Sequence, residues 1–306
     1  MQTAALFSVP ASIAVPQRPK TRLVAFDYAP FPYDGTIGRT DLPFFNVAEN
    51  GRRGHRTPFN RVYWENETYN DPRVLLHIPR GFDIRKPGVI VLFFHGHGAK
   101  LERDVLRRQQ VPQQISDSGA NAVLIAPQLA VDARDSSIGK LWEPGGVKRF
   151  LGEAAGKLAQ LYGNPGTKDA FGKMPVVIIA YSGGYIPAAW AISSGGLGRR
   201  LEGVVLLDAL YGETEKFTNW ITNRRSGFFV SAYANSTRSR NQDYEKALTQ
   251  LNIPVRDRLG SLGQGSVVFI STDPETEHRD FVTKAWVDDP IKDLLRRMTF
   301  VEHASL

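Results

Sequence analysis

The sequence predicts an α/β fold, with a mostly parallel central sheet that carries helices on both faces. The first observation is a rhythm that begins at residue 73, where short runs rich in Val, Ile and Phe alternate with segments of helical spacing. Such runs are typical of strands that are buried on both faces of a parallel sheet. The second is composition: 306 residues with 42% hydrophobic and 23% charged residues suit one large folded domain.

The expected strands are continuous apolar runs of five or six residues. They are Val74–Ile78, Val89–Phe94, Ala122–Ala126, Val176–Tyr181, Val204–Asp208, Phe228–Tyr233 and Val267–Ser271. Between the third and fourth of these runs, apolar residues from Phe150 to Leu161 recur at helical spacing and predict a helix. Near the end of the chain, Asp289 is expected to be the N-cap of a helix that begins at Pro290.

The chain divides at about residue 72. Residues 1–72 are rich in Pro, Gly, Asn and aromatic residues and show no helical period, so we expect an irregular region with short strands packed on the rest. Residues 73–306 form the α/β domain, with small lid-like insertions expected near residues 128–147 and 209–226.

Charge and cysteine content narrow the classes of function. The net charge is +7, but the basic residues are scattered, with acidic residues between them and no basic run interleaved with aromatics, so nucleic-acid binding is not expected. The absence of cysteine excludes disulfides and thiolate metal sites. No apolar run approaches the ~20 residues of a membrane-spanning helix.

The start of the chain does not resemble a signal peptide, because it lacks a basic region and carries Pro10 and Pro16. A Pro-rich start and the missing cysteines favour a processed periplasmic or secreted protein over a cytoplasmic one.

The segment around Ser182 is the first candidate for chemistry. Ala180-Tyr181-Ser182-Gly183-Gly184 follows an apolar strand and precedes a predicted helix, Tyr185–Ser193. A serine hydroxyl becomes a useful nucleophile when a base takes its proton and a tight strand-to-helix turn exposes it. Small neighbours are required in such a turn. The usual pattern has Gly at the first position, and this chain has Ala180.

A second glycine-rich turn follows the strand Val89–Phe94, with the sequence His95-Gly96-His97-Gly98. Its backbone N–H groups are candidates to bind an oxyanion together with the N–H after the nucleophile. We expect the donors to be Gly183 and either His97 or Gly98. Alternatively, His95 and His97 lie two residues apart and could bind one metal ion, although no carboxylate–histidine cluster completes such a site.

The order of these motifs resembles the α/β-hydrolase family. A strand, His-Gly-His-Gly, a crossover, a second strand and Ala-Tyr-Ser-Gly-Gly follow one another, and the resemblance covers about residues 73–298. It implies an α/β-hydrolase fold and a catalytic triad in the chain order Ser, Asp or Glu, then His.

Strand counting then selects the base. Only His278 and His303 follow Ser182. With Val89–Phe94 as strand three of the family, Val267–Ser271 is strand eight, and the family's histidine lies in the loop after it. His278 occupies that loop and is the expected base, and His303, beyond the last helix, is the alternative.

The resemblance implies an acid after strand seven or, in some members of the family, after strand six, and the loop after strand seven, Ala234-Asn235-Ser236-Thr237, contains no carboxylate. Asp208 ends strand six, from which a carboxylate can also reach the histidine. A carboxylate that ends an apolar strand needs a partner, and an imidazole N–H would provide one. Asp208 is therefore the expected acid, with Asp273 as the alternative and a simple turn-capping role for Asp208 also open.

The pocket walls are expected from loops at the carboxyl ends of the strands. Candidate substrate-contacting aromatics are Trp142, Tyr181, Tyr185 and Tyr211, each of which is equally compatible with ordinary packing. Nothing in the sequence indicates a nicotinamide, flavin or nucleoside phosphate site, and no cofactor or metal is expected. The sequence thus predicts a serine esterase acting on a small molecule. The alternatives are an amidase or peptidase with the same triad, or a non-catalytic binding protein of the same fold.

Overall fold

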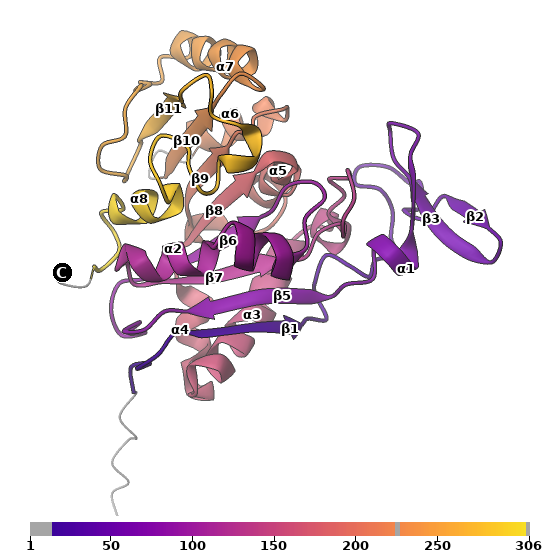
Figure 1. The fold of residues 1–306 in the computed structure, drawn as a ribbon, viewed down its shortest axis with the longest axis horizontal. Coiled ribbons are helices and arrows are strands. Elements are labelled where there is room, and N and C mark those ends of the chain that lie inside the picture. Colours follow the sequence, from indigo (N-terminus) through magenta and orange to yellow (C-terminus); the bar gives the residue numbers. More distant parts are fainter. Residues whose placement is uncertain (1–13, 224–226, 304–306) are drawn as a thin grey trace, which may run out of the picture.

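The structure is a computed structural model, which describes residues 14–223 and 227–303. Its main sheet has eight strands in the order β1-β5-β7-β6-β8-β9-β10-β11 (Figure 1). Their bounds are β1 Lys20–Ala25, β5 Arg73–Ile78, β6 Val89–Phe94, β7 Ala122–Pro127, β8 Val176–Tyr181, β9 Leu201–Leu207, β10 Phe228–Tyr233 and β11 Val267–Ser271. Only β5 runs against its neighbours, β1 and β7, and the other pairs are parallel. The predicted mostly parallel sheet is confirmed.

Helices cover both faces of this sheet (Figure 1). One face carries a π-helix, η1 (Leu101–Arg108), with α2 (Val111–Ser118) and α8 (Pro290–Arg296). The other carries α3 (Gly146–Tyr162), α4 (Lys168–Lys173), α5 (Tyr185–Ser193), α6 (Thr214–Asn223) and α7 (Arg238–Gln250). Short 3₁₀ turns complete the connections: η2 Gly139–Trp142, η3 Pro165–Thr167, η4 Ser182–Gly184, η5 Gly198–Arg200 and η6 His278–Asp280.

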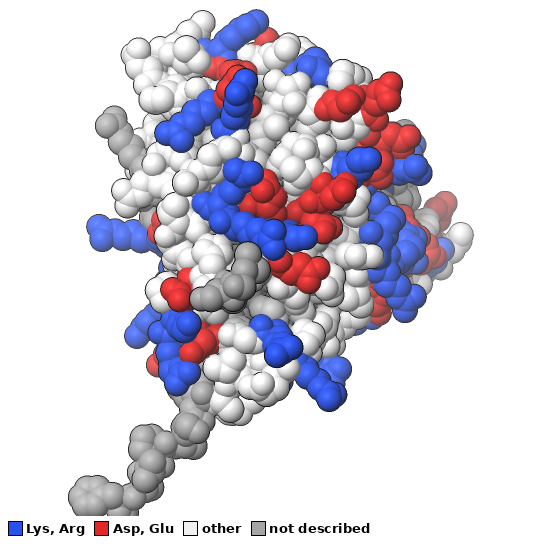
Figure 2. Space-filling model, turned by 60° about the vertical axis from the view of Figure 1, so that its left-hand side comes forward, with Lys and Arg blue, Asp and Glu red and all other residues white. Residues whose placement is uncertain are grey.

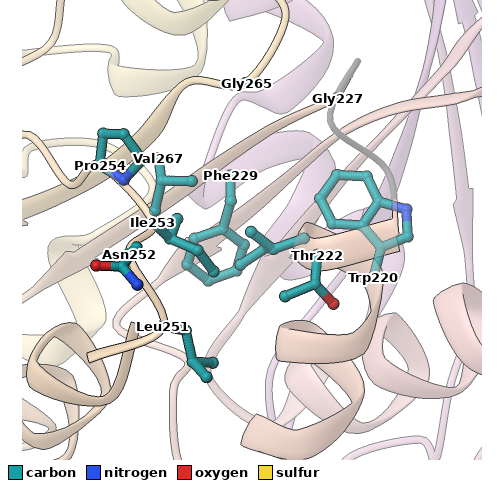
Figure 3. Close-up of a pocket in the computed structure, with 11 residues that line it drawn as sticks. Trp220, Thr222, Gly227, Phe229, Leu251, Asn252, Ile253, Pro254, Gly265 and Val267 are labelled. Atoms are coloured by element: carbon teal, nitrogen blue, oxygen red, sulfur yellow. The ribbon is translucent and has the colours of Figure 1, made fainter. Parts of the chain in front are cut away.

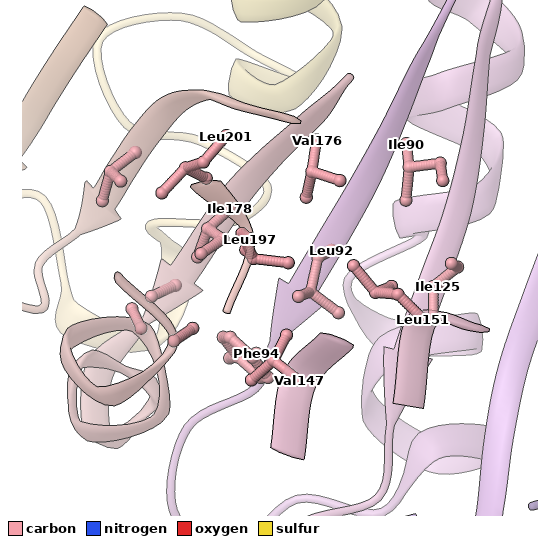
Figure 4. Close-up of a cluster of buried hydrophobic side chains, with 14 of the residues drawn as sticks. Ile90, Leu92, Phe94, Ile125, Val147, Leu151, Val176, Ile178, Leu197 and Leu201 are labelled. Atoms are coloured by element: carbon pink, nitrogen blue, oxygen red, sulfur yellow. The ribbon is translucent and has the colours of Figure 1, made fainter. Parts of the chain in front are cut away.

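The two-residue period of a strand explains why the central strands are apolar throughout. In β6, Ile90, Leu92 and Phe94 enter the core beneath α3 and α5, while the residues between them face α2 and α8. Figure 4 shows Leu92 and Phe94 of β6 beside Val147 and Leu151 of α3. Because both faces are covered, no strand position in β6 or β8 reaches solvent.

The N-terminal region contributes to two sheets. Its strand β1 forms the edge of the main sheet against β5, and β2 (Val47–Glu49), β3 (Arg52–Arg56) and β4 (Val62–Trp64) form a separate three-stranded sheet followed by α1 (Glu65–Thr68). An aromatic cluster joins the loops around this small sheet to the loop after β7. Its buried members are Phe31, Tyr33, Phe44, Tyr69, Ala130 and Ala133.

The last helix begins at Pro290 as predicted, but the Asp289 side chain makes no capping hydrogen bond. Asp289 has a left-handed φ of 56° and its carboxylate pairs with Lys292 at 3.4 Å instead. Of the insertion expected at 209–226, residues 224–226 lie outside the described residues, and much of the remainder is α6.

The charged surface residues are of both signs. On the face shown in Figure 2, Lys and Arg side chains alternate with Asp and Glu rather than forming one basic patch. Within residues 14–223 and 227–303, no helix has the length and apolar character needed to cross a membrane.

Candidate active site

Ser182 lies at the carboxyl end of β8, in the tight turn η4 that leads into α5. Its φ is 54°, a left-handed value that is unusual for a residue with a side chain. The turn requires glycine at two positions, Gly96 in the neighbouring loop after β6 and Gly184 within the turn itself. A Cβ on Gly96 would lie 2.7 Å from the Cβ of Ser182, and one on Gly184 would lie 2.4 Å from the carbonyl oxygen of Phe94. The methyl of Ala180, by contrast, is fully buried in the core of the α3 and α5 face.

His278 and Asp208 continue from Ser182 as a chain of hydrogen bonds. The Oγ of Ser182 lies 2.8 Å from Nε2 of His278, and Nδ1 of His278 lies 2.5 Å from Oδ2 of Asp208. Three distant segments meet here: the end of β8, the residue after β9 and the loop after β11. Because an ionised carboxylate only accepts, Nδ1 carries the proton and Nε2 is free to accept the serine proton.

Asp208 is completely buried and has a left-handed φ of 43°. Its Oδ2 also accepts from the hydroxyl of Ser236, and its Oδ1 accepts from the hydroxyl of Thr237 at 2.5 Å. Burial raises the pKa of the Asp208 carboxyl, but the hydrogen bonds from His278, Ser236 and Thr237 outweigh burial and hold the pKa below its ordinary value of 3.8. The carboxylate is therefore ionised at neutral pH.

The alternatives for base and acid lie elsewhere. His303 is in a bridge with Ala120, near the amino end of β7, and its Nε2 lies 3.1 Å from the carbonyl oxygen of Met298. Asp273 accepts from the N–H of Glu275 at 2.9 Å and is exposed. Neither residue makes a hydrogen bond or ion pair with Ser182 or His278 in the part of the chain that the structure describes.

Two backbone N–H groups lie close to Ser182, one from His97 in the loop after β6 and one from Gly183 in the turn after β8. In the described residues, the N–H groups of His97 and Gly183 have no hydrogen-bond acceptor, whereas the N–H of Gly98 donates to the carbonyl of Ala133 at 2.8 Å. Gly98 is thus not available to an oxyanion in this arrangement. A Cβ on Gly183 would lie 2.5 Å from Cδ2 of His97, so the two donor-bearing residues are in close contact.

His95 has a structural role in this loop. Its Nδ1 donates to the carbonyl of Gly96 at 2.8 Å, and its Nε2 accepts from the N–H of Leu129 at 3.0 Å. Burial lowers its pKa to about 4, so the ring is neutral at pH 7. With both nitrogens occupied, His95 has no lone pair for a metal ion, and no group of three potential ligands occurs among residues 14–223 and 227–303.

The π-helix η1 links the loop after β6 to the loop that carries His278. Asp104, which is buried, accepts from the side chains of Arg103 and Arg108. Arg103 donates to the carbonyl of Gly98, and Arg108 donates at 3.2 Å to the carbonyl of Arg279, the residue after His278. This network was not among the sequence predictions.

The predicted aromatic residues divide into two groups. Tyr181 stacks on His278 at 5.1 Å and donates its hydroxyl to the carbonyl of His278 at 3.1 Å. Burial raises the pKa of Tyr181 to about 12, so it remains a neutral donor. Tyr211 meets the edge of His278 at 6.3 Å and Tyr185 at 5.9 Å.

Trp142 differs from the three tyrosines, because its ring packs against Tyr33 at 6.1 Å and Phe44 at 5.8 Å. It therefore helps to attach the N-terminal region. These contacts are packing contacts, one of the two roles that the sequence allowed for Trp142.

Sequence reasoning missed Ser236 and Thr237. The loop after β10 contains no carboxylate, but it supplies the two hydroxyls that donate to Asp208 at the end of the neighbouring strand. Adjacent parallel strands end at the same sheet edge, and this placement was the available signal.

A cavity of about 300 Å³ lies away from this site (Figure 3). Phe229, Val267 and Gly265 line it at the amino ends of β10 and β11, together with Trp220 of α6. Ser182 lies at the opposite, carboxyl edge of the sheet. The cavity is therefore separate from the Ser182 site.

No protein-family model matches the sequence, and no curated protein matches it. Among solved structures, the feruloyl esterase module from Clostridium thermocellum, solved as a serine-to-alanine mutant complexed with sinapinate, has a TM-score of 0.50 and 13% identity, covering 90% of this chain and 99% of that chain. An S-formylglutathione hydrolase from Agrobacterium tumefaciens has a TM-score of 0.46 and 10% identity, covering 82% and 97%. Brefeldin A esterase, a bacterial homologue of human hormone sensitive lipase, has a TM-score of 0.45 and 12% identity, covering 96% of this chain and 78% of that chain.

The chain has the α/β-hydrolase fold. The strand order and the resemblance to the feruloyl esterase module agree with the fold expected from the motif order.

Proposed function

We propose that this protein is a serine hydrolase that cleaves a carboxylic ester of a small molecule through an acyl-enzyme intermediate. The observation that carries the proposal is the hydrogen-bond chain from Ser182 through His278 to the buried Asp208, next to two backbone N–H groups without an acceptor in the described residues. A base, an oriented nucleophile and oxyanion donors are the components that acyl transfer requires.

In the first half of the reaction, Nε2 of His278 takes the hydroxyl proton of Ser182 while Oγ of Ser182 forms a bond to the carbonyl carbon of the ester. The carbonyl oxygen becomes an oxyanion that accepts from the N–H groups of Gly183 and His97. His278 Nε2–H then gives its proton to the leaving alkoxide oxygen, the carbon–oxygen bond to that group breaks, and an alcohol departs. Asp208 stabilises the imidazolium throughout without taking the proton.

In the second half, water replaces the alcohol. His278 takes a proton from the water while the water oxygen attacks the acyl carbon. His278 then returns the proton to Oγ of Ser182 as the bond between Oγ and the acyl carbon breaks. The products are a carboxylic acid and the free enzyme.

The direct test is labelling with a fluorophosphonate probe. The wild-type protein is expected to react, and Ser182→Ala is expected to lose both labelling and hydrolysis of a short-chain p-nitrophenyl ester. Thermal unfolding of the variant checks that it is folded. If wild-type protein is not labelled and hydrolyses no ester, the binding-protein alternative replaces the proposal.

The base is tested by a matched pair of histidine variants. His278→Ala should lose on the order of 10³-fold or more in kcat, and His303→Ala should keep the wild-type rate, because His303 lies against Met298 instead. The opposite result would exclude His278 as the base. Comparing kcat/KM for a p-nitrophenyl ester and the p-nitroanilide of the same acyl group separates the esterase from an amidase.

A further inference from the structure

A second hydroxyl–imidazole pair lies against the proposed oxyanion site. Nε2 of His97 is 2.6 Å from Oγ of Ser136, in the loop after β7. A Cβ built on Gly183 would lie 2.6 Å from that Nε2 and 2.9 Å from that Oγ. Both polar atoms therefore border Gly183, whose N–H has no acceptor in the described residues.

The hydrogen between these two atoms can come from either partner. Burial lowers the pKa of His97 below 6.5, so its imidazole is neutral at pH 7 and carries one ring proton. When that proton is on Nε2, His97 donates to Ser136 and the proton of Ser136 is free for another acceptor. No contact in the described residues holds the ring proton on Nδ1 instead.

The segment that carries Ser136 is fixed on both sides. The carboxylate of Asp135 accepts from the hydroxyl of Ser137 at 3.0 Å and from the hydroxyl of Tyr69 at 2.8 Å. The carbonyl of Ala133 accepts from the N–H of Gly98 at 2.8 Å, which ties this loop to the one that carries His97. A donor held in this way needs little reorganisation during the reaction, which is the condition for effective oxyanion stabilisation.

We propose that Ser136 is a further catalytic residue, whose hydroxyl, oriented by His97, donates a third hydrogen bond to the oxyanion. The inference rests on the proposed function and adds a side-chain donor to the backbone N–H groups of Gly183 and His97. A neutral His97 suits this role because His278 becomes a cation in the transition state, and a second cation nearby would oppose it.

The test compares two neighbouring serines. Ser136→Ala is expected to lower kcat for a short-chain p-nitrophenyl ester by about 10- to 100-fold, up to the lower end of the range for losing one oxyanion donor, with KM changed less than about threefold. Ser137→Ala is the matched comparison, because it removes one contact that holds this loop to Asp135 but no donor to the oxyanion, and its kcat should fall by less than about threefold. Ser136→Thr keeps a hydroxyl and should recover most of the lost rate.

A transition-state analogue provides the readout that a structural role would not change. A trifluoromethyl ketone forms a tetrahedral adduct with an oxyanion, so its inhibition constant should rise by the same factor as kcat falls in Ser136→Ala. A change in KM with unchanged kcat, or an unchanged inhibition constant, would overturn the proposal. If Ser136→Ala does not fold, His97→Phe tests the same pair and should show the same loss in kcat.

The two proposals fail in different ways. Full activity in Ser136→Ala together with an inactive Ser182→Ala would remove the third donor and keep the serine hydrolase. An active Ser182→Ala would remove the proposed function itself.

Discussion

The Ser182–His278 pair and the Ser136–His97 pair have similar lengths, 2.8 and 2.6 Å, but different groups lie behind their imidazoles. Behind His278 is the buried carboxylate of Asp208, which accepts from Nδ1 at 2.5 Å. Nδ1 of His97 has no acceptor among the described residues. A serine–histidine contact alone therefore does not distinguish a nucleophile from a hydrogen-bond donor.

Asp135, the carboxylate closest in sequence to the Ser136–His97 pair, does not support His97 as Asp208 supports His278. Asp135 adjoins Ser136, yet its two oxygens accept from Ser137 and from Tyr69. Its charge raises the pKa of His97, but burial lowers it more. An imidazole without a carboxylate acceptor is neither held in one tautomer nor stabilised as a cation, so we expect only Ser182 to be acylated.

The largest expected effect comes from exchanging the carboxylates for amides. Asp208→Asn should lower kcat by on the order of 10⁴-fold, because the amide no longer fixes the proton on Nδ1 of His278. Asp135→Asn should leave kcat within about threefold and lower the melting temperature through its contacts with Tyr69 and Ser137. Steady-state kinetics on one ester decides: a larger loss in Asp135→Asn than in Asp208→Asn would reverse our assignment of the two pairs.

Two further histidines form a third class, buried and neutral. His77 lies 2.8 Å from the hydroxyl of Thr21 and 2.9 Å from that of Ser116, and burial lowers the pKa of both His77 and His95 to about 4. Since these folded values lie below 6.5, their contribution to stability is complete above pH 6.5 and is lost as the pH falls towards 4. Each should therefore lower the free energy of unfolding by about 2 kcal/mol between pH 7.5 and pH 5.

Urea unfolding at the two pH values measures this loss. His77→Gln should reduce it and leave kcat unchanged, because His77 is on β5, away from the nucleophile. His95→Gln should reduce it and also lower kcat, because His95 orients the loop of His97 through Gly96 and Leu129. Identical pH dependence in wild type and His77→Gln would show that His77 is not the acid-sensitive group.

The contact between the two pairs at Gly183 predicts the next effect. In Gly183→Ala, the new methyl would lie 2.5–2.6 Å from the His97 ring, which must move together with Ser136. We expect kcat to fall about 10- to 100-fold. Gly152→Ala, in α3 with no atom within 4 Å of the new methyl, should keep kcat and raise stability by about 0.5–1 kcal/mol. Equal kinetics of these two variants would contradict the close packing around Gly183.

The main sheet was predictable because each central strand is apolar on both faces, and the strand count that this allowed placed His278 in the loop after β11. The pairing of β1 with β5 was not, because β1 has the sequence Lys-Thr-Arg-Leu-Val-Ala and is only half-buried as an edge strand. Its position depends on tertiary pairing rather than on local pattern.

Within the site, the sequence predicted the backbone turns but not the side-chain hydrogen-bond partners. Ser182 and His97 stand in glycine-rich turns, which leave a local signature. Ser136, Ser236 and Thr237 are hydroxyls in polar loops, where such residues are common, and their partners lie 28 to 39 residues away along the chain. Likewise, whether Gly98 or His97 offers a free N–H depends on Ala133, which only the folded loop brings near.

The smallest expected effect concerns the hydroxyls behind Asp208, which have no counterpart behind His97. Thr237→Val keeps the shape of the side chain but removes the hydrogen bond to Oδ1 of Asp208. Because this bond lowers the pKa of a carboxyl that is ionised in the folded state, the variant should lose about 1–2 kcal/mol of stability at pH 7. The loss should shrink as the pH falls through the folded pKa of Asp208, which lies below 3.8, because the carboxyl then takes up a proton.

In the same variant, kcat should fall by less than about tenfold, since Ser236 and His278 still bind Asp208. Ser239→Ala, on the exposed side of α7, is the matched control and should change neither quantity. A stability loss in Thr237→Val that stays the same as the pH falls through the lowered pKa of folded Asp208 would assign the effect to packing. A stability loss confined to the pH range in which Asp208 is ionised would show that Thr237 stabilises the carboxylate behind His278. In the part of the chain that the structure describes, His97 has no such carboxylate behind it.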